Sequence, residues 1–384
     1  MTNKPQFVGE RVRLGDVATY INGYAFKPTD YASEGKPIIR IQDLTGNAYQ
    51  TNRFAGVLDD KYRIRCGDVL ISWSASLGVY EWGAEEAWLN QHIFKVQFNK
   101  LPVNKRFFIH QTRYVIAESS SLAHGATMRH LTKKVFDNLP FFYPSEDDQD
   151  EISCRLDGIQ LQIERAEGQI AKLDQLVKSR FVEMFENGKT DTVRLGDWCE
   201  KITKGTTPTT AGYSFIDDGI NFIKVETLSD SGDFIPDKLA HISCECHAAL
   251  KRSQLKEGDL LFSIAGAIGR IAIVTSDVMP ANTNQALAII RLNKNAPFEL
   301  SFLKQALSSS AVVAVAEKLK RGVAQINLSL KDVGNFLIPC PDMETQRDYS
   351  ACVSQVDKSR FVAQQQIEKL QMLYDSLAQE YFGD

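Results

Sequence analysis

The stretch Val12-Arg13-Leu14-Gly15-Asp16 occurs a second time as Val193-Arg194-Leu195-Gly196-Asp197. Further matches follow in the same order through both halves of the chain. They are Ile39-Arg40-Ile41 with Ile223-Lys224-Val225, Gly67–Ser72 with Gly258–Ser263, Gly78 with Gly269, Asn90-Gln91 with Asn284-Gln285, and Gly125, Asn138, Pro144 and Gln149 with Gly322, Asn335, Pro341 and Gln346. The separation between the matched stretches grows slowly, so insertions lie between shared elements. The sequence therefore predicts two copies of one fold in a single chain.

Short runs rich in Val, Ile and Phe, bounded by Gly, Asn and Asp, predict strands within each copy. These runs are residues 37–41, 69–73, 92–98, 222–225 and 286–292. Residues 105–120 and 299–320 predict helices between strands. Each copy is therefore expected to be an α+β domain of mixed sheet and helices.

Each copy ends in a long stretch with apolar residues at alternating spacings of four and three, which is typical of a coiled coil. The seam residues are Ile152, Leu156, Ile159, Ile163, Ile170, Leu173 and Val177 in the first stretch, and Val353, Val356, Ile367, Leu370, Tyr374 and Leu377 in the second. A proline and acidic residues precede both stretches, as at a helix N-terminus. Two matched seams favour packing of the helices on each other over packing of each on its own domain. The repeat then implies pseudo-twofold symmetry.

Charge separates the same segments. We place the domains at 1–145 and 189–341 and the helices at 146–188 and 342–384. The first domain carries 18 basic and 13 acidic residues and the second 17 and 16, so the net charge of -4 comes from the helices. The two domains therefore leave room for a surface that faces phosphates.

Composition excludes several classes of protein. Hydrophobic residues make up 43% of the chain and charged residues 24%, which excludes a disordered or fibrous protein. No apolar run reaches the roughly 20 residues of a membrane span, and the first residues contain no signal-peptide pattern. Seven scattered cysteines favour reduced thiols. We expect a cytoplasmic protein without a membrane partner.

Catalytic and metal-site patterns are weak. His241, Cys244, Cys246 and His247 have zinc-ligand chemistry, but they crowd into seven residues without separated cysteine pairs. Asp237 with Gln254 and Lys256 could belong to a nuclease, but this spacing is common and has no match in the first copy. No Pro-Pro of an adenine methyltransferase motif occurs. We predict no catalytic residue and no metal site, which favours a binding protein.

DNA is the partner that fits two similar bodies on a rigid spacer. Each helix is about 50 Å long at about 1.5 Å per residue. Two reading bodies meet the same groove from one side when their centres lie about 34–36 Å apart, one turn of the duplex. A spacer of this length can enforce such a separation.

The repeated motifs resemble the specificity subunits of type I restriction-modification enzymes. The resemblance rests on Val-Arg-Leu-Gly-Asp, the two Gly-Asp strand motifs, the Asn-Gln pairs, and the proline followed by glutamine that opens each long helix. It covers the chain from about residue 11 onward. One departure is Trp73-Ser74-Ala75-Ser76, which replaces the glycine found at Gly266.

The resemblance implies two target recognition domains, each followed by a conserved spacer helix, with the helices paired as an antiparallel coiled coil. The domains would read the two parts of a split, asymmetric target in double-stranded DNA. The subunit would be non-catalytic and have no cofactor of its own. It would recruit two methyltransferase subunits that use S-adenosylmethionine, and a motor-nuclease subunit that uses ATP and Mg.

Basic and amide residues in loops and at strand ends are the candidates for DNA contacts. Arg can read guanine, Asn and Gln can read adenine, and Lys mostly contacts phosphates. The candidates are Lys27, Arg40, Arg63, Arg65, Arg129, Lys133, Lys134, Lys204, Lys224, Arg252, Arg270, Arg321, Gln325 and Asn327. Tyr24, Trp73 and His124 could stack on bases.

Two alternatives stay open. One is a self-sufficient enzyme that cleaves or methylates DNA, which metal-dependent cleavage by the isolated chain would favour. The other is a dumbbell scaffold that joins proteins, and binding that does not weaken with salt would favour it.

Overall fold

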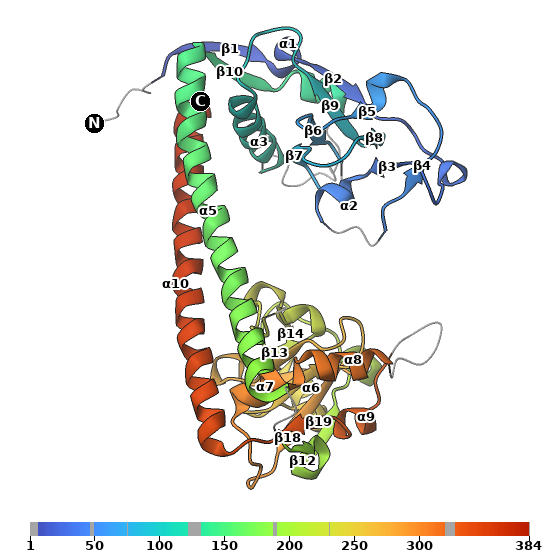
Figure 1. Cartoon of the computed structure of the whole chain (residues 1–384), viewed down its shortest axis with the longest axis vertical. Coiled ribbons are helices and arrows are strands. Elements are labelled where there is room, and N and C mark those ends of the chain that lie inside the picture. Colours follow the sequence, from blue (N-terminus) through green and yellow to red (C-terminus); the bar gives the residue numbers. More distant parts are fainter. Residues whose placement is uncertain are drawn as a thin grey trace. The chain divides into compact units, whose positions relative to one another are not determined.

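The computed structural model describes residues 7–46, 50–74, 76–121, 132–186, 190–229, 231–318 and 327–383. Contacts divide the chain into two compact units. Unit 1 comprises residues 1–166 and 365–384, and unit 2 comprises residues 167–364. Each unit contains one α+β body and part of both long helices, α5 (Glu146–Phe181) and α10 (Met343–Phe382) (Figure 1).

Two four-stranded sheets form the body of unit 1. One has the antiparallel order β2-β9-β6-β7, and the other has the order β4-β3-β8-β5, in which β3 and β8 are parallel. The strands are β1 (Gly9–Arg13), β2 (Thr19–Asn22), β3 (Lys36–Ile39), β4 (Arg53–Phe54), β5 (Arg63–Ile64), β6 (Val69–Ser72), β7 (Gly78–Glu81), β8 (Ala87–Leu89), β9 (Ile93–Gln97) and β10 (Pro140–Pro144). The helices are α1 (Leu14–Val17), α2 (Ile41–Leu44), α3 (Lys105–Ser121) and α4 (Lys133–Asp137), with 3-10 turns η1 (Pro28–Asp30) and η2 (Asp60–Tyr62). Strand β1 pairs with β10, and α3 packs on β7 and β10.

Unit 2 repeats this arrangement. Its sheets have the orders β12-β18-β15-β16 and β14-β13-β17, and β13 and β17 are the parallel pair. The strands are β11 (Thr192–Arg194), β12 (Cys199–Lys204), β13 (Ile220–Ile223), β14 (Ala240–Ile242), β15 (Leu260–Ser263), β16 (Ile271–Ile273), β17 (Ala281–Thr283), β18 (Leu287–Leu292) and β19 (Leu337–Pro339). The helices are α6 (Cys244–Ala249), α7 (Leu300–Leu307), α8 (Ser310–Lys318), α9 (Leu330–Gly334) and a π-helical turn η3 (Val182–Glu186). The 3-10 turns are η4 (Leu195–Trp198), η5 (Pro208–Ala211), η6 (Val225–Thr227), η7 (Pro236–Lys238), η8 (Lys251–Ser253) and η9 (Ser276–Val278).

The predicted internal repeat and fold class are confirmed. Strand β2 corresponds to β12, the parallel pair β3 and β8 to β13 and β17, and β6, β7 and β9 to β15, β16 and β18. The small sheet β1-β10 corresponds to β11-β19. Both bodies are thus the same mixed sheet arrangement with helices.

The matched Gly-Asp pairs are turns that lead into a central strand. Gly67 and Gly258 have φ of +87° and +84°, a conformation that glycine adopts without a steric penalty. In each turn the glycine N–H donates to the chain beyond the neighbouring strand, at Trp82 O and Val274 O. The Asp68 carboxylate accepts the N–H three residues earlier at 2.8 Å, and Asp259 does the same. These motifs therefore specify the fold.

Two buried glutamines fix the start of each long helix. Gln149 and Gln346 are fully buried. The Gln149 side chain accepts from Asn104 N–H at 2.9 Å and donates to Pro144 O at 3.1 Å. Gln346 makes the same two bonds, with Glu299 N–H and Pro341 O, both at 2.9 Å. Each glutamine ties its long helix to the first turn of α3 or α7.

The two long helices run in opposite directions within each unit. In unit 1, Arg155 donates to Tyr381 Oη at 3.2 Å, while His110 bridges Asp157 and Tyr374. In unit 2, Arg360 pairs with Asp174 at 2.7 Å, and Tyr349 donates to Val177 O. Residue numbers rise along α5 as they fall along α10, so the pairing is antiparallel.

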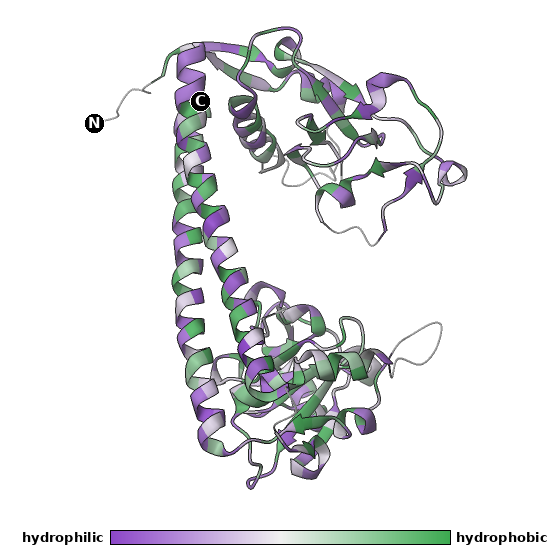
Figure 2. Cartoon of the chain, viewed as in Figure 1, coloured by the Kyte–Doolittle hydropathy of each residue, from purple (hydrophilic) through white to green (hydrophobic). Residues whose placement is uncertain are grey.

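All the predicted seam residues are buried or half-buried. Ile152 and Leu156 join the core of unit 1 with Ala378, Tyr381 and Phe382 of α10. In unit 2, Val177 and Val353 pack against the core that contains Tyr349 and Phe181. Hydrophobic and hydrophilic residues alternate along both helices in Figure 2.

Several predicted element boundaries are wrong. The strand expected at 37–41 ends at Ile39, because the N–H of Arg40 donates to Asp43 and opens α2. The helix expected at 299–320 breaks into α7 and α8, where the Ser309 hydroxyl accepts the Val312 N–H and caps the second helix. No helix in the described parts of the chain is long and apolar enough to cross a membrane.

Candidate nucleic-acid interface

The two sheets of unit 1 end at a common edge. Asn22 ends β2, and Ser72, which ends β6, lies opposite Ile93 at the start of β9. The parallel strands β3 and β8 end beside them, where Asn90 N–H donates to Ile39 O at 3.3 Å. The strand-end face of unit 1 is defined by the residues that follow these ends, Asn22, Tyr24, Arg40, Trp73, Asn90 and His92.

Trp73 is at the centre of this face. Its Nε1–H donates to Asn22 Oδ1 at 3.3 Å, and its ring centroid lies 5.4 Å from that of His92. The ring also stacks on Phe94 at 5.7 Å with an interplanar angle of 24°. Asn22 and His92 are exposed, whereas Trp73 is half-buried. Polar and aromatic groups from three separate segments of the chain thus meet at Trp73.

Unit 2 has an equivalent face with different chemistry. The matched positions are Lys204, Thr206, Lys224, Ile264, Asn284 and Ala286, which define the strand-end face of unit 2. Backbone bonds hold it together, since Ile264 N–H donates to Ala286 O at 2.8 Å and Thr206 N–H to Thr283 O at 3.1 Å. Gly23 and Gly205 precede Tyr24 and Thr206, and a side chain at either would overlap a backbone carbonyl of the facing turn. The same close approach therefore shapes both faces.

The structure brings most of the described candidates of unit 2 to this face. Lys204 is exposed on it, and Lys224 lies over the Phe215 ring at 4.5 Å. Arg252 donates to Thr206 Oγ1 at 3.0 Å, whereas the Arg270 guanidinium donates to Leu228 O at 3.1 Å. Asn327 is exposed next to Leu328, whose N–H donates to Ile264 O at 2.9 Å.

The candidates of unit 1 are more dispersed. Arg40 lies on the face, half-buried, with Nε 3.1 Å from Asp43 Oδ2. Lys27 is exposed in the loop after β2. Arg63 and Arg65 share the carboxylates of Asp60 and Glu86 in a charged cluster beside β5 and β8.

Lys133 and Lys134 are not brought to the face. They belong to α4, which contacts α1. Helix α1 precedes the first residue of β2, whereas the face lies at the last residue of β2. Lys133 pairs with Asp137 at 3.0 Å. Arg129, His124, Arg321 and Gln325 lie outside the described residues. As DNA contacts, all fourteen residues stay predictions.

Asn22 and His92 also lie on the strand-end face of unit 1, although no pattern in the sequence made them candidates. Their contact with Trp73 joins residues far apart in the chain, which no local pattern reveals. Trp73 and His92 directly follow the matched residues Ser72 and Gln91, so their place beside two matched motifs is visible in the sequence.

The weak metal and nuclease patterns lie in folded structure. Across the described ranges, no group of three or more His, Cys, Asp and Glu side chains is placed to hold a metal ion. Cys246 is buried on α6, and His247 Nδ1 bonds Asn282. Gln254 donates to His247 O at 2.7 Å. The short helix at this place is Cys244–Ala249.

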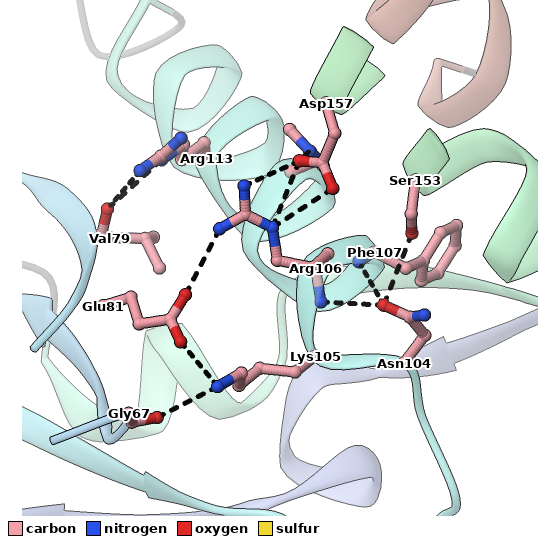
Figure 3. Close-up of polar contacts among 11 residues, drawn as sticks. Gly67, Val79, Glu81, Asn104, Lys105, Arg106, Phe107, Arg113, Ser153 and Asp157 are labelled. Carbon is pink, nitrogen blue, oxygen red and sulfur yellow. Dashed lines mark hydrogen bonds and ion pairs between the residues drawn. The ribbon is translucent and has the colours of Figure 1, made fainter. Parts of the chain in front are cut away.

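A polar network connects the body of unit 1 to both long helices, and Figure 3 shows its contacts with α5. Lys105 and Arg106 of α3 pair with Glu81 at 2.6 and 3.2 Å. Arg106 also pairs with Asp157 of α5 at 2.8 Å. His110 lies between Asp157 Oδ1 at 2.8 Å and Tyr374 Oη at 2.7 Å.

Burial and hydrogen bonding set the charges in this junction. Burial lowers the pKa of His110, although Asp157 opposes the shift. Burial alone would raise the pKa of Asp157, but hydrogen bonds from Arg106 and His110 outweigh it and lower that pKa. A neutral His110 can donate from Nε2 to the ionised Asp157 and accept from Tyr374 at Nδ1.

Comparison with known proteins identifies the family. The family described as "Type I restriction modification DNA specificity domain" matches residues 9–175 and again residues 187–372. The chain belongs to this family. Two family domains in one chain agree with the two structural units and with the internal repeat.

Two relatives that match nearly the whole chain are specificity subunits of type I restriction enzymes. The type I restriction enzyme EcoBI specificity subunit of Escherichia coli is 27% identical over 378 residues, covering 90% of this chain and 78% of the relative. The MjaVIII specificity subunit of Methanocaldococcus jannaschii is 21% identical, covering 94% and 89%.

Solved structures share the fold. The S subunit of a type I restriction-modification system from M. genitalium superposes with a TM-score of 0.51 at 13% identity, covering 100% of this chain and 98% of the other. A chain from a study of complex assembly in a type I restriction-modification system gives 0.55 at 17% identity, covering 100% and 99%. At these identities the likeness supports the fold alone.

Proposed function

We propose that this chain is the DNA-reading subunit of a type I restriction-modification enzyme and that each unit reads one part of a split, asymmetric target. The observation that carries the proposal is the pair of strand-end faces. They occupy the same place in two copies of one fold, yet their side chains differ. Two different readers in one chain suit a target whose two parts differ.

The antiparallel α5 and α10 suit a spacer between the two readers. Each helix begins in one unit and ends in the other. A continuous helix has a fixed rise per residue, so its length sets a fixed number of base pairs between the two parts of the target.

The chain itself would be non-catalytic and would recruit two methyltransferase subunits and a motor-nuclease subunit. Methylation would use S-adenosylmethionine, and the motor-nuclease would use ATP and Mg, all held by the partners. The proposed compartment is the cytoplasm, where the DNA is.

Apolar side chains on the outer surface of α10 suit a protein partner. Phe361, Val362 and Met372 are 63%, 62% and 63% exposed, and Leu373 is 48% exposed. Residues eleven positions apart on an α-helix face the same side, so Phe361 and Met372 share a face, as do Val362 and Leu373. Exposed apolar residues that cluster in this way mark interaction surfaces. Phe361→Glu with Met372→Glu should abolish co-purification of the methyltransferase subunits, whereas Gln371→Glu, an exposed residue on another side of the same helix, should not.

The test of the proposal is a base-resolution map of methylated adenines in host DNA with and without this gene. Loss of one split, asymmetric motif on deletion, and its return on complementation, is the expected result. A methylation pattern that does not depend on the gene would contradict the proposal.

A further inference from the structure

We propose that Asn22 and His92 read bases in the part of the target that unit 1 binds, with the Asn22 side chain offering a hydrogen-bond donor to an acceptor on a base edge. Unit 2 lacks this pair and contacts the DNA backbone at the matched position through Lys204. The inference rests on the proposed function and deepens it, because it assigns the base-reading groups of one unit.

Trp73 fixes the orientation of the Asn22 amide. An indole N–H is only a donor, so the atom of Asn22 that it meets at 3.3 Å is the oxygen Oδ1. The Nδ2 group therefore points the other way, and among the described residues it has no acceptor. Asn22 is exposed at the end of β2. The side chain thus presents two N–H donors to whatever lies against the strand-end face of unit 1.

Trp73 is itself held in place, so this orientation is rigid. Its ring stacks on Phe94, which is 2% exposed, and its backbone N–H donates to His92 O at 3.4 Å. A polar group held by a packed neighbour loses less conformational entropy on binding than a free one. Trp73 is therefore a positioning residue for Asn22 and not the base-reading group.

His92 supplies the second polar group. It is exposed, and its ring leans on Trp73 with centroids 5.4 Å apart and an interplanar angle of 56°. In either protonation state an imidazole offers at least one N–H donor. Neither of its ring nitrogens has a hydrogen-bond partner within the described part of the chain.

The matched positions in unit 2 carry no such pair. Lys204 replaces Asn22, Ile264 replaces Trp73 and Ala286 replaces His92. Ile264 is 3% exposed and cannot accept or donate from its side chain. A lysine ammonium is a point charge that mostly contacts phosphates, so we assign Lys204 to the DNA backbone. Unit 2 must therefore read its part of the target from other positions.

The donor orientation of Asn22 limits the base that it can face. Guanine presents N7 and O6, thymine presents O4 and adenine presents N7 as acceptors in the major groove, whereas cytosine presents an amino donor. We therefore infer that the base facing Asn22 is guanine, thymine or adenine, and that a cytosine there is rejected.

The experiment uses the full chain assembled with its methyltransferase subunits, after the wild-type motif has been mapped. Binding is measured to the cognate duplex and to duplexes with each single base pair changed. Asn22→Ala should lose about tenfold of the discrimination at one position of one part of the target, which is the usual weight of one base contact. His92→Ala should act on the same part. Lys204→Ala is the matched control, and it should weaken binding to all duplexes alike and make it less sensitive to salt.

Asn22→Asp distinguishes a direct base contact of residue 22 from a purely structural role. An aspartate can still accept from Trp73 Nε1, but it presents an acceptor where the asparagine presented a donor. The preferred base at that position should therefore change to cytosine, which presents an amino donor and no acceptor in the major groove. Equal weakening for every duplex, or wild-type discrimination at every position in both Asn22→Ala and Asn22→Asp, would overturn the inference. Absence of any split motif in the wild type would instead contradict the proposed function.

Discussion

Both units pack aromatic rings where the body meets the long helices, such as Phe107 on Phe382 of α10 in unit 1, with ring centroids 5.6 Å apart. Unit 1 adds a charged network there, which the matched residues Leu300, Ser301, Gln305 and Ser354 of unit 2 do not form. In unit 1, Lys105 and Arg106 pair with Glu81 and Asp157 around His110 (Figure 3). In unit 2, the corresponding turn of α7 places Phe302 against Phe185 and Phe181, with ring centroids 4.9 and 5.7 Å apart.

Matched positions in the two junctions carry different side chains. Lys105 and Leu300 occupy the same place beside the matched glycines. A Cβ atom at Gly67 would lie 3.7 Å from Lys105 Nζ, and one at Gly258 would lie 3.6 Å from Leu300 Cδ1. The buried glutamines Gln149 and Gln346 are present in both junctions. The repeat thus preserves the backbone contacts and lets the side-chain chemistry change, and the two junctions should respond differently to mutation and to pH.

The largest effect is expected in the aromatic junction. Phe302→Ala removes a fully buried ring and should lower the free energy of unfolding of unit 2 by about 3–5 kcal/mol. Native-state hydrogen exchange of α7 measures it. Phe107→Ala, at the matched and equally buried position of α3, should instead accelerate exchange in unit 1. Equal acceleration in both units by Phe302→Ala would show that the junctions are not independent.

A charge in the helix seam should have the next largest effect. Leu370→Asp and Leu173→Asp each place a carboxylate at a half-buried position without a partner, which should cost about 2–3 kcal/mol. Helix pairing should weaken, and the assembled complex should lose site-specific methylation. Exposed Leu176→Asp on α5 is the control and should leave methylation intact. Methylation that survives both seam changes would contradict the spacer role of the helices.

A smaller effect is expected in the charged junction. Asp157→Ala leaves Arg106 and His110 without a common acceptor and should cost about 1–3 kcal/mol. Ser354→Ala, at the matched exposed position of α10, should change stability by less than about 0.5 kcal/mol. Hydrogen exchange of α3 and α7 separates the two. Unchanged hydrogen exchange of α3 in the Asp157→Ala chain would show that this network does not stabilise unit 1.

The smallest effect is a pH dependence confined to unit 1. The pKa of His110 is lower in the folded protein than in the unfolded chain, chiefly because it is buried. The unfolded chain therefore binds more protons at acid pH, and the stabilisation is complete above the ordinary histidine pKa of about 6.5 and declines as the pH falls below it. The lowered pKa of Asp157 acts in the same direction at still lower pH.

His110→Gln copies the matched residue Gln305 and should remove the decline below about pH 6.5. Hydrogen exchange of α3 at pH 7 and pH 5.5, corrected for the intrinsic rate, measures it, with α7 as the internal control. A decline of equal size in the variant would assign the pH dependence to other groups.

The large-scale fold could be predicted from the sequence because its signals are periodic or repeated. The seam spacing predicts α5 and α10, and the ordered matches predict the two copies. The parallel pairing of β3 with β8 could not be predicted, since these strands are short and nearly fifty residues apart. The break between α7 and α8 was missed because it depends on how Ser309 caps the following helix.

The candidate site was less predictable than the fold. Most of the matched motifs specify turns and helix junctions in the scaffold, whereas Arg40 and Asn90 and their matches Lys224 and Asn284 lie on the strand-end faces. Arg40 and Lys224 are candidates because they are basic residues at strand ends, whereas Asn22 and His92 become candidates only through their contact with Trp73. Lys133 and Lys134 are basic loop-side residues in the sequence, yet α4 holds them at the other end of β2.

The central claim is that the shared positions build the fold and that the strand-end faces read DNA. The most direct measurement is a base-resolution methylation map for a chain in which the strand-end face of unit 1 takes residues of unit 2, by Asn22→Lys, Trp73→Ile and His92→Ala. One part of the split motif should change, while the other part and the gap between them stay the same. A motif that is unchanged, or one that changes in both parts, would contradict it.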